Sequence, residues 1–315
     1  MTLAAPASTN AQGSLPALAF LDDAYTTLRR APRPEHVHAL IDRIDAHRRA
    51  LAPDAWRTVA LAAQVHPLAA LLLQDPYTAR AFAKPRGYAG DAVMLDYLYG
   101  THEVDPATLT PVGHAVWTAT TGAASAEAVR DRRRRLAATV DAVATRCAGA
   151  EILSVAAGHA REIELSQAFR EGRVSRWRCL DQDTESLEAI TRRHPHDARV
   201  EAIRCPVRNL LREGVSGSAD LVYTAGLLDY LGNDVARALL ERLWAAVRPG
   251  GQLVVANFAN DSRERGYMEA FMDWWLIYRA EDDLRSLGST LDGAALRVFR
   301  DATRRTVWLE ARRAH

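Results

Sequence analysis

The chain has 315 residues, enough for two domains or for one large domain with an attached cap. Its hydrophobic content of 48% and charged content of 25% are ordinary for a globular protein and argue against a disordered or fibrous chain. The formal net charge is only +1, so the composition does not indicate general electrostatic binding of nucleic acid or of an anionic membrane.

The three cysteines, Cys147, Cys179 and Cys205, are sparse, odd in number and without CxxC spacing. This pattern argues against a disulfide framework and against a structural zinc site, and no metal is expected. Residues 1–14 lack the charged and apolar regions of a signal peptide and are expected to form a flexible tail. We therefore expect a cytoplasmic protein without membrane insertion, and the sequence leaves its oligomeric state open.

Residues 15–146 show apolar residues at helical spacing and are expected to form a helical cap domain. Four residues at i, i+3, i+4 and i+7 illustrate this spacing: Val37, Leu40, Ile41 and Ile44. The apolar run 59–73 is expected to form two buried helices broken at Pro67. The basic run RDRRRR at 130–135 is expected to form a solvated face or intramolecular ion pairs rather than a nucleic-acid site.

From residue 147 onward, short apolar runs alternate with amphipathic segments. Five strands are expected over 151–157, 176–182, 199–205, 219–225 and 251–258. Helices are expected over 160–171, 184–194, 233–247, 262–279 and 281–288. Two further runs, 294–301 and 305–313, are expected to pair as an antiparallel hairpin at the sheet edge. This alternation is typical of an α/β fold with a mostly parallel sheet and helices on both faces.

Ligands of open α/β sheets bind at the carboxyl ends of the strands, so the residues that end each strand are the candidates for binding. Asp181 stands about twenty residues beyond the loop after the first strand, where an acidic side chain can accept hydrogen bonds from ribose hydroxyls. That loop contains only Gly158, whereas a dinucleotide pyrophosphate favours G-x-G-x-x-G. The combination favours a nucleoside ligand such as S-adenosylmethionine and makes a dinucleotide oxidoreductase a distant alternative.

Four segments follow one another in order ahead of the final strand pair: ILSVAAGHARE, LDQD, ADLVYTAGLLDYL and LWAAVRPGGQLVVANF. Through them, residues 150–313 resemble the class I S-adenosylmethionine-dependent methyltransferases. One departure is Ala156, which stands where such enzymes often carry glycine. The resemblance implies a Rossmann-like seven-stranded sheet, S-adenosylmethionine as cofactor, and a cofactor-binding domain over 147–315.

Two further segments, FAKPRGYAGDAVMLDYLYG and YMEAFMDWWLIYRAEDDL, are similar to a bacterial subgroup of these proteins. Its members are often labelled as extracellular factor 3-hydroxypalmitic acid methyl ester biosynthesis proteins. In that subgroup a helical N-terminal region with KPRGYAGD precedes the Rossmann-like domain. Enzymes that cyclise S-adenosylmethionine into azetidine-2-carboxylate also use this general fold, so the resemblance does not fix the activity.

The resemblance implies that residues 156–158 pass under the methionine part of the cofactor. It places Asp181 at the ribose, Gln182 beside the adenine and residues 206–207 at the adenine edge. Residues 224–226 are expected near the sulfonium. The expected cofactor-binding residues are therefore Ala156, Ala157, Gly158, Asp181, Gln182, Pro206, Val207, Thr224, Ala225 and Gly226.

The candidate catalytic residues come from the KPRGYAGD turn and from the end of the fourth strand: Tyr88, Asp91, Asp229 and Tyr230. Glycines allow the turn to approach a ligand closely, and Tyr88 is expected near the sulfonium, where an aromatic ring attracts a cation by about 0.5–2 kcal/mol. Asp91 is expected to cap the following helix, and a purely structural capped turn is the alternative. Asp229 and Tyr230 are expected to face the substrate, and a simple helix-entry turn is their alternative.

The function expected from these features is methyl transfer from S-adenosylmethionine to an oxygen or nitrogen of a small-molecule acceptor by in-line displacement. Cyclisation of S-adenosylmethionine, which yields azetidine-2-carboxylate and methylthioadenosine, is the first alternative. A non-catalytic cofactor-binding module is the second. No nucleic-acid partner is expected.

Overall fold

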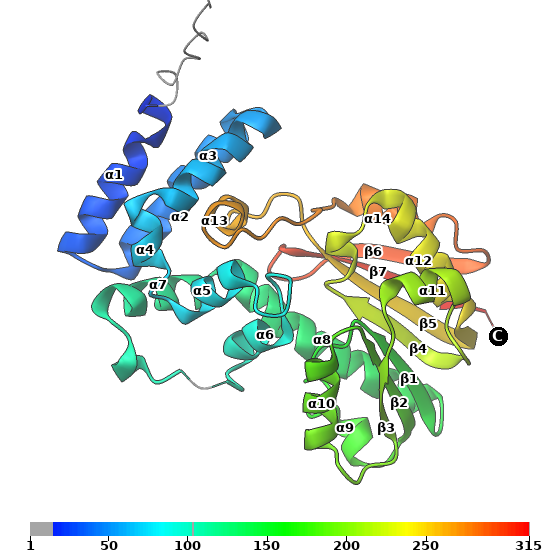
Figure 1. Ribbon diagram of the computed structural model, residues 1–315. Helices are drawn as coiled ribbons and strands as arrows, with labels where there is room; N and C mark the ends of the chain where they lie inside the picture. The colour runs from blue at the N-terminus through cyan, green and yellow to red at the C-terminus, as the bar shows by residue number, and fades with distance from the viewer. Residues whose placement is uncertain (1–14, 103, 315) are drawn as a thin grey trace, which may run out of the picture. The chain divides into compact units, whose positions relative to one another are not determined.

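The structure, a computed structural model, describes residues 15–102 and 104–314, and the expected tail at 1–14 lies outside the described residues. The chain divides into two compact units (Figure 1), which we describe separately. Unit 1 comprises the described parts of Met1–Ala83, Val104–Thr121 and Arg263–Trp274. Unit 2 comprises those of Lys84–Glu103, Gly122–Ser262 and Trp275–His315. This division differs from the boundary expected at residue 146, because the long helix that ends there packs on the sheet.

Unit 1 consists of helices and their connecting loops, with no strand among its described residues. Its elements are α1 (Leu15–Arg30), α2 (Pro34–Ala50), α3 (Pro53–Val65), α4 (Pro67–Leu72), α5 (Pro76–Ala83), the 3₁₀ turn η1 (Pro106–Thr108), α7 (Pro111–Thr121) and α13 (Arg265–Phe271). Many of these helices begin at proline, which fits the first turn because it lacks the N–H that would be unsatisfied there. The expected break at Pro67 is confirmed. The apolar stripe of α2 is also confirmed, with Val37, Leu40, Ile41 and Ile44 buried.

Unit 2 is built on a seven-stranded sheet with the order β3-β2-β1-β4-β5-β7-β6. The strands are β1 (Ala150–Val155), β2 (Val174–Asp181), β3 (Val200–Arg204), β4 (Ala219–Ala225), β5 (Val247–Phe258), β6 (Ala294–Arg300) and β7 (Thr306–Arg313). The first five strands are parallel, and β7 pairs antiparallel with both β5 and β6. The expected Rossmann-like sheet with its edge hairpin is confirmed.

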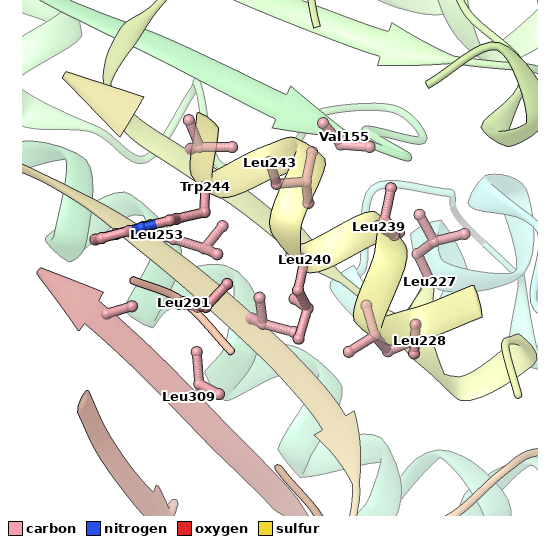
Figure 2. Close-up of a cluster of buried hydrophobic side chains, with 14 of the residues drawn as sticks. Val155, Leu227, Leu228, Leu239, Leu240, Leu243, Trp244, Leu253, Leu291 and Leu309 are labelled. Atoms are coloured by element: carbon pink, nitrogen blue, oxygen red, sulfur yellow. The ribbon is translucent and has the colours of Figure 1, made fainter. Parts of the chain in front are cut away.

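Helices cover both faces of this sheet (Figure 1). The helical elements of unit 2 are α6 (Ala92–Tyr99), α8 (Ala124–Arg146), α9 (Gln167–Arg170), α10 (Thr184–Arg193), α11 (Val207–Glu213), the 3₁₀ turn η2 (Leu228–Tyr230), α12 (Asn233–Ala245) and α14 (Glu281–Gly288). The α8, α9 and α10 helices pack on one face, and α11, α12 and α14 on the other. In Figure 2, Leu240 and Leu243 of α12 lie among the buried side chains that include Leu253 and Leu309 of the sheet. Within the described residues, no helix has the length and apolar character needed to cross a membrane.

Three local predictions were wrong. The helix expected over 160–171 is limited to α9: Ala160, at its expected start, has φ +48°, which no α-helix tolerates, and residues 161–165 form turns. The helix expected over 262–279 ends at Phe271. Conversely, α11 forms in a segment for which no helix was expected, with Pro206 at its N-cap.

Candidate functional site

The loop after β1 contacts both the end of β2 and the start of α6. Gly158 has φ +54°, and an added Cβ would lie 3.3 Å from the Cβ of Ala92 on α6. The Gly158 N–H donates to Oδ2 of Asp181 at 2.7 Å. Glycine therefore suits this position because it accepts the left-handed backbone and fills little space against α6.

Asp181 ends β2 and is only 6% exposed. Its Oδ2 accepts the N–H of Gly158, and its Oδ1 accepts the N–H of Asp183 at 2.8 Å. Burial raises the pKa of Asp181, while these backbone N–H groups oppose the rise. A carboxylate offers about four acceptor positions, so these bonds leave part of its acceptor capacity unused. Asp181 is thus fixed in orientation; it does not itself line either of the two pockets described below, but its neighbours Gln182 and Asp183 line one of them.

A wide pocket of about 710 Å³ lies at the carboxyl ends of β2 and β3. Small-molecule sites commonly measure about 300–1,000 Å³, so this volume suits a nucleoside-sized ligand. Four predicted site residues meet in its walls: Tyr88, Gln182, Pro206 and Val207. Burial raises the pKa of Tyr88, and the neighbouring Asp181 and Asp183 raise it further. The Tyr88 hydroxyl therefore stays protonated at neutral pH and is available as a donor.

A second, more enclosed cavity of about 60 Å³ lies at the ends of β1 and β4. Four predicted cofactor-binding residues line it: Ala156, Ala157, Gly158 and Ala225. Glu162 and Tyr223 form another part of its wall, and the Tyr223 hydroxyl donates to Glu162 at 2.5 Å. Burial raises the pKa of both groups. The wall of this cavity is therefore polar, and three arginines also line it: Arg132, Arg133 and Arg161.

Arg86 fixes the KPRGYAGD turn against the N-terminus of α10. Its guanidinium donates to Oδ2 of Asp183 at 2.9 Å, to Oγ of Ser186 at 3.0 Å and to Glu185 at 3.2 Å. The side chain is 9% exposed, so these bonds are shielded from solvent. The turn thereby holds Tyr88 at the wide pocket. Asp91 begins α6 as predicted, accepting the Met94 N–H at 2.8 Å, and lines neither pocket.

A second contact anchors α6 on the loop after β1. Asp96 of α6 accepts hydrogen bonds from Nε of Arg161 at 2.8 Å and from Nη2 at 2.5 Å, and lies 2.7 Å from Nδ1 of His159. Burial alone would raise the pKa of Asp96, but the bonds from His159 and Arg161 hold it well below its usual range. His159 and Arg161 belong to the turns after β1, where a regular helix was expected.

The remaining predicted residues lie elsewhere. Thr224 is 1% exposed, and its Oγ1 has no hydrogen-bond partner among the described residues. Gly226 has φ +100° and follows β4. Asp229 and Tyr230 line neither pocket: the Asp229 carboxylate accepts the Phe258 N–H at 2.7 Å, and Tyr230 is 40% exposed.

The sequence analysis missed Arg132, which lines the enclosed cavity and is 7% exposed. Two arginines of the same basic run, Arg130 and Arg134, pair with Glu127, as expected for intramolecular ion pairs. Helical spacing could have distinguished Arg132 from them. It lies four residues after Ala128 and four before Leu136, which are both buried, and so occupies the apolar stripe of α8.

Asp229 gives the stability of the protein a specific pH dependence. Burial raises its pKa to about 6, above about 3.9 in an unfolded chain. The folded state therefore binds this proton more tightly, and the stabilisation is complete below pH ~4 and lost as the pH rises through ~6. Between pH 4 and 7, we expect the free energy of unfolding of the wild type to fall by up to about 3 kcal/mol more than that of Asp229→Asn. Urea unfolding of both proteins across this pH range measures the difference. A wild-type-to-variant difference that stays constant with pH would contradict the assignment.

Comparison with known proteins supports the fold of the chain. Neither a scan of protein families nor a search of curated proteins found a match. A solved structure of a "possible exported protein" from Bordetella parapertussis is 18% identical with a TM-score of 0.59, covering 84% of this chain and 100% of that one. Magnesium protoporphyrin IX methyltransferase (ChlM) from Synechocystis PCC 6803 with bound SAH is 15% identical with a TM-score of 0.51, covering 75% of this chain and 98% of that one. At these identities the likeness establishes that the chain has the Rossmann-like fold found in methyltransferases.

Proposed function

We propose that this protein is an S-adenosylmethionine-dependent methyltransferase that acts on an oxygen or nitrogen of a small-molecule acceptor. The observation that carries the proposal is the carboxylate of Asp181, which the N–H groups of Gly158 and Asp183 orient at the carboxyl end of β2, next to Gln182 and Asp183 of the wide pocket. The fold shared with a methyltransferase that binds S-adenosylhomocysteine supports it.

The residues of the two pockets fit this cofactor. The wide pocket is lined mostly by polar and charged residues, and within it Pro206 and Val207 offer apolar surface to an adenine ring while Gln182 offers an amide to its edge. The loop at 156–158 lines the enclosed cavity, whose volume of about 60 Å³ has room for the end of the methionine part. The loop has one glycine where a pyrophosphate would favour three, so a dinucleotide fits less well. When bound, S-adenosylmethionine supplies a methyl carbon that is activated by the adjacent positive sulfur.

The residues of the chain bind, orient and exclude water in this account. Tyr88, held by the KPRGYAGD turn, borders the nucleoside pocket, and its protonated hydroxyl can donate a hydrogen bond. Arg86 secures that turn through Asp183, the residue that also donates its N–H to Asp181. Binding of the nucleoside and placement of the turn are therefore coupled through adjacent residues. Such positioning and desolvation favour in-line displacement without a dedicated acid or base.

The test follows the methyl group. The protein is incubated with S-adenosylmethionine carrying a trideuteromethyl group and with a small-molecule fraction of a bacterial extract, and products are identified by mass spectrometry. We expect a labelled acceptor together with S-adenosylhomocysteine, at a rate that Asp181→Ala lowers. A heat-inactivated sample controls for spontaneous transfer.

Other outcomes of this experiment identify the alternatives. Methylthioadenosine with a cyclic amino acid, formed from S-adenosylmethionine alone, would replace methyl transfer by cyclisation. Intact S-adenosylmethionine, bound but unconsumed with every acceptor fraction, would favour a non-catalytic binding module. Either result would retain the cofactor site and overturn the proposed reaction.

A further inference from the structure

The turns after β1 contain two alanines in a backbone conformation that alanine disfavours. Ala156 has φ +53° and Ala160 has φ +48°, whereas Ala157 between them does not have a positive φ. The left-handed region is disfavoured by roughly 5–30-fold for each residue that carries a Cβ. Residues in such conformations persist only where the surrounding structure holds them, and they cluster at functional sites. Ala156 and Ala160 therefore need contacts that hold the turn.

Asp96 of α6 contacts the residues on both sides of Ala160. Its carboxylate accepts hydrogen bonds from Nε of Arg161 at 2.8 Å and from Nη2 at 2.5 Å. Its Oδ2 also lies 2.7 Å from Nδ1 of His159. Asp96 and His159 are both buried, so these charge-assisted contacts are shielded from solvent. One carboxylate, which comes from a helix 63 to 65 positions earlier in the chain, thus restrains the chain before and after Ala160.

The path of the turn sets a backbone donor at the end of β2. The N–H of Gly158 donates to Oδ2 of Asp181 at 2.7 Å, two residues before Ala160. Residues 156–160 also line the enclosed cavity. A change in the backbone at Ala160 would therefore alter both the wall of the cavity and the bond that orients Asp181.

The sequence offers this segment another conformation. The spacing of its apolar residues predicts a helix over 160–171, which would need Ala160 in the right-handed region. In the structure, residues 161–165 form turns, and α9 begins only at Gln167. The local preference of the sequence thus opposes the observed path of the chain, and contacts from a distant segment must favour it.

We propose that Asp96 is a positioning residue, which holds the turn after β1 in its ligand-binding conformation. The inference rests on the proposed function for the identity of the ligand, whereas the contacts that hold Ala160 exist without any ligand. Without the Asp96 carboxylate, the turn relaxes toward conformations with Ala160 in the right-handed region. The apparent affinity for the cofactor then falls with the fraction of molecules that keep the observed turn.

The test combines loss of the Asp96 contacts with relief of the strain. S-adenosylhomocysteine is titrated by calorimetry into the wild type, Asp96→Asn and the double variant Asp96→Asn/Ala160→Gly. We expect Asp96→Asn to weaken binding by about 5–30-fold, which corresponds to the strain of one left-handed alanine. The double variant should recover most of the lost affinity, because glycine adopts the left-handed conformation without this strain.

Two control variants separate relief of strain from other effects. Asp96→Asn/Ala157→Gly places a glycine in the same turn at a residue without a positive φ, so it should not recover the affinity. Asp282→Asn removes an exposed carboxylate of α14 that pairs with Arg285. Its affinity for S-adenosylhomocysteine should equal that of the wild type.

Hydrogen exchange of the ligand-free proteins tests the hold on the turn directly. Exchange in the peptide 156–165, followed by mass spectrometry, should be faster in Asp96→Asn than in the wild type, with the strands of the sheet unchanged. Arg161→Gln is a second variant, because it removes the paired donors of the Asp96 carboxylate. It should give the same exchange pattern, and so tests the proposal even if Asp96→Asn does not fold.

The outcomes distinguish this inference from the proposed function. Unchanged affinity together with unchanged exchange in Asp96→Asn would overturn the inference. Equal losses of affinity in the two double variants would also overturn it, in favour of a general structural role for Asp96. If the wild type does not bind S-adenosylhomocysteine, the proposed function fails, whereas faster exchange of the turn in Asp96→Asn would still support the hold on Ala160.

Discussion

Replacing Arg279 by methionine is expected to lower the free energy of unfolding by about 3–5 kcal/mol, the largest loss we expect from a single polar side chain. Arg279 is 1% exposed. It donates to the carbonyl of Leu228 at 2.7 Å and of Leu231 at 2.5 Å, and to the side-chain oxygens of Asn257 at 2.7 Å and Asn233 at 3.0 Å. The methionine variant would leave these buried acceptors without their donor.

Urea unfolding followed by tryptophan fluorescence measures this loss. Arg285→Met is the matched control, because Arg285 is 55% exposed and pairs only with exposed Asp282. Surface pairs of this kind contribute about 0–1 kcal/mol, so the control should stay close to the wild type. A loss below about 1 kcal/mol for Arg279→Met would show that the network does not hold the 228–233 segment as described.

Asp181→Ala is expected to weaken S-adenosylhomocysteine binding by about 1–3 kcal/mol, or roughly 5–150-fold. The variant removes the acceptors of two backbone N–H groups as well as the proposed ribose contact. A ligand analogue without both ribose hydroxyls distinguishes these effects. If Asp181 binds the ribose, Asp181→Ala and the wild type should bind this analogue with similar affinity. The loss from the substitution and the loss from removing the ribose hydroxyls are then not additive.

Glu188→Ala is the control for this experiment, since Glu188 is an exposed carboxylate of α10 with one surface pair to Arg192. Its affinity for S-adenosylhomocysteine should equal that of the wild type. Equal and additive losses with both ligands would mean that Asp181 only supports the loop, and unchanged affinity would remove it from the site.

Much of unit 2 could be predicted because the apolar residues of its strands and helices recur at regular spacing in the sequence. Runs such as 219–225 are apolar, short and followed by an amphipathic segment, and β4 has these bounds in the structure. The resemblance to class I methyltransferases then implied Gln182, Pro206 and Val207 as cofactor-binding residues, and the structure brings these three together in one pocket.

The parts that could not be predicted depend on single dihedrals or on contacts distant in sequence. Nothing in the pattern after β1 distinguishes alanines in a helix from Ala156 and Ala160 with positive φ. The bond between Arg86 and Asp183 joins residues 97 positions apart. Arg132 was read with its run of arginines, although its position on the buried stripe of α8 sets it apart from them.

The proposed function requires that the protein bind S-adenosylmethionine. Isothermal titration of the purified protein with S-adenosylhomocysteine, S-adenosylmethionine and NAD⁺ tests it without knowledge of the acceptor. We predict one-site binding of both sulfur nucleosides and no detectable binding of NAD⁺. Binding of NAD⁺ without binding of either sulfur nucleoside, or no binding of any of the three, would contradict the proposed function.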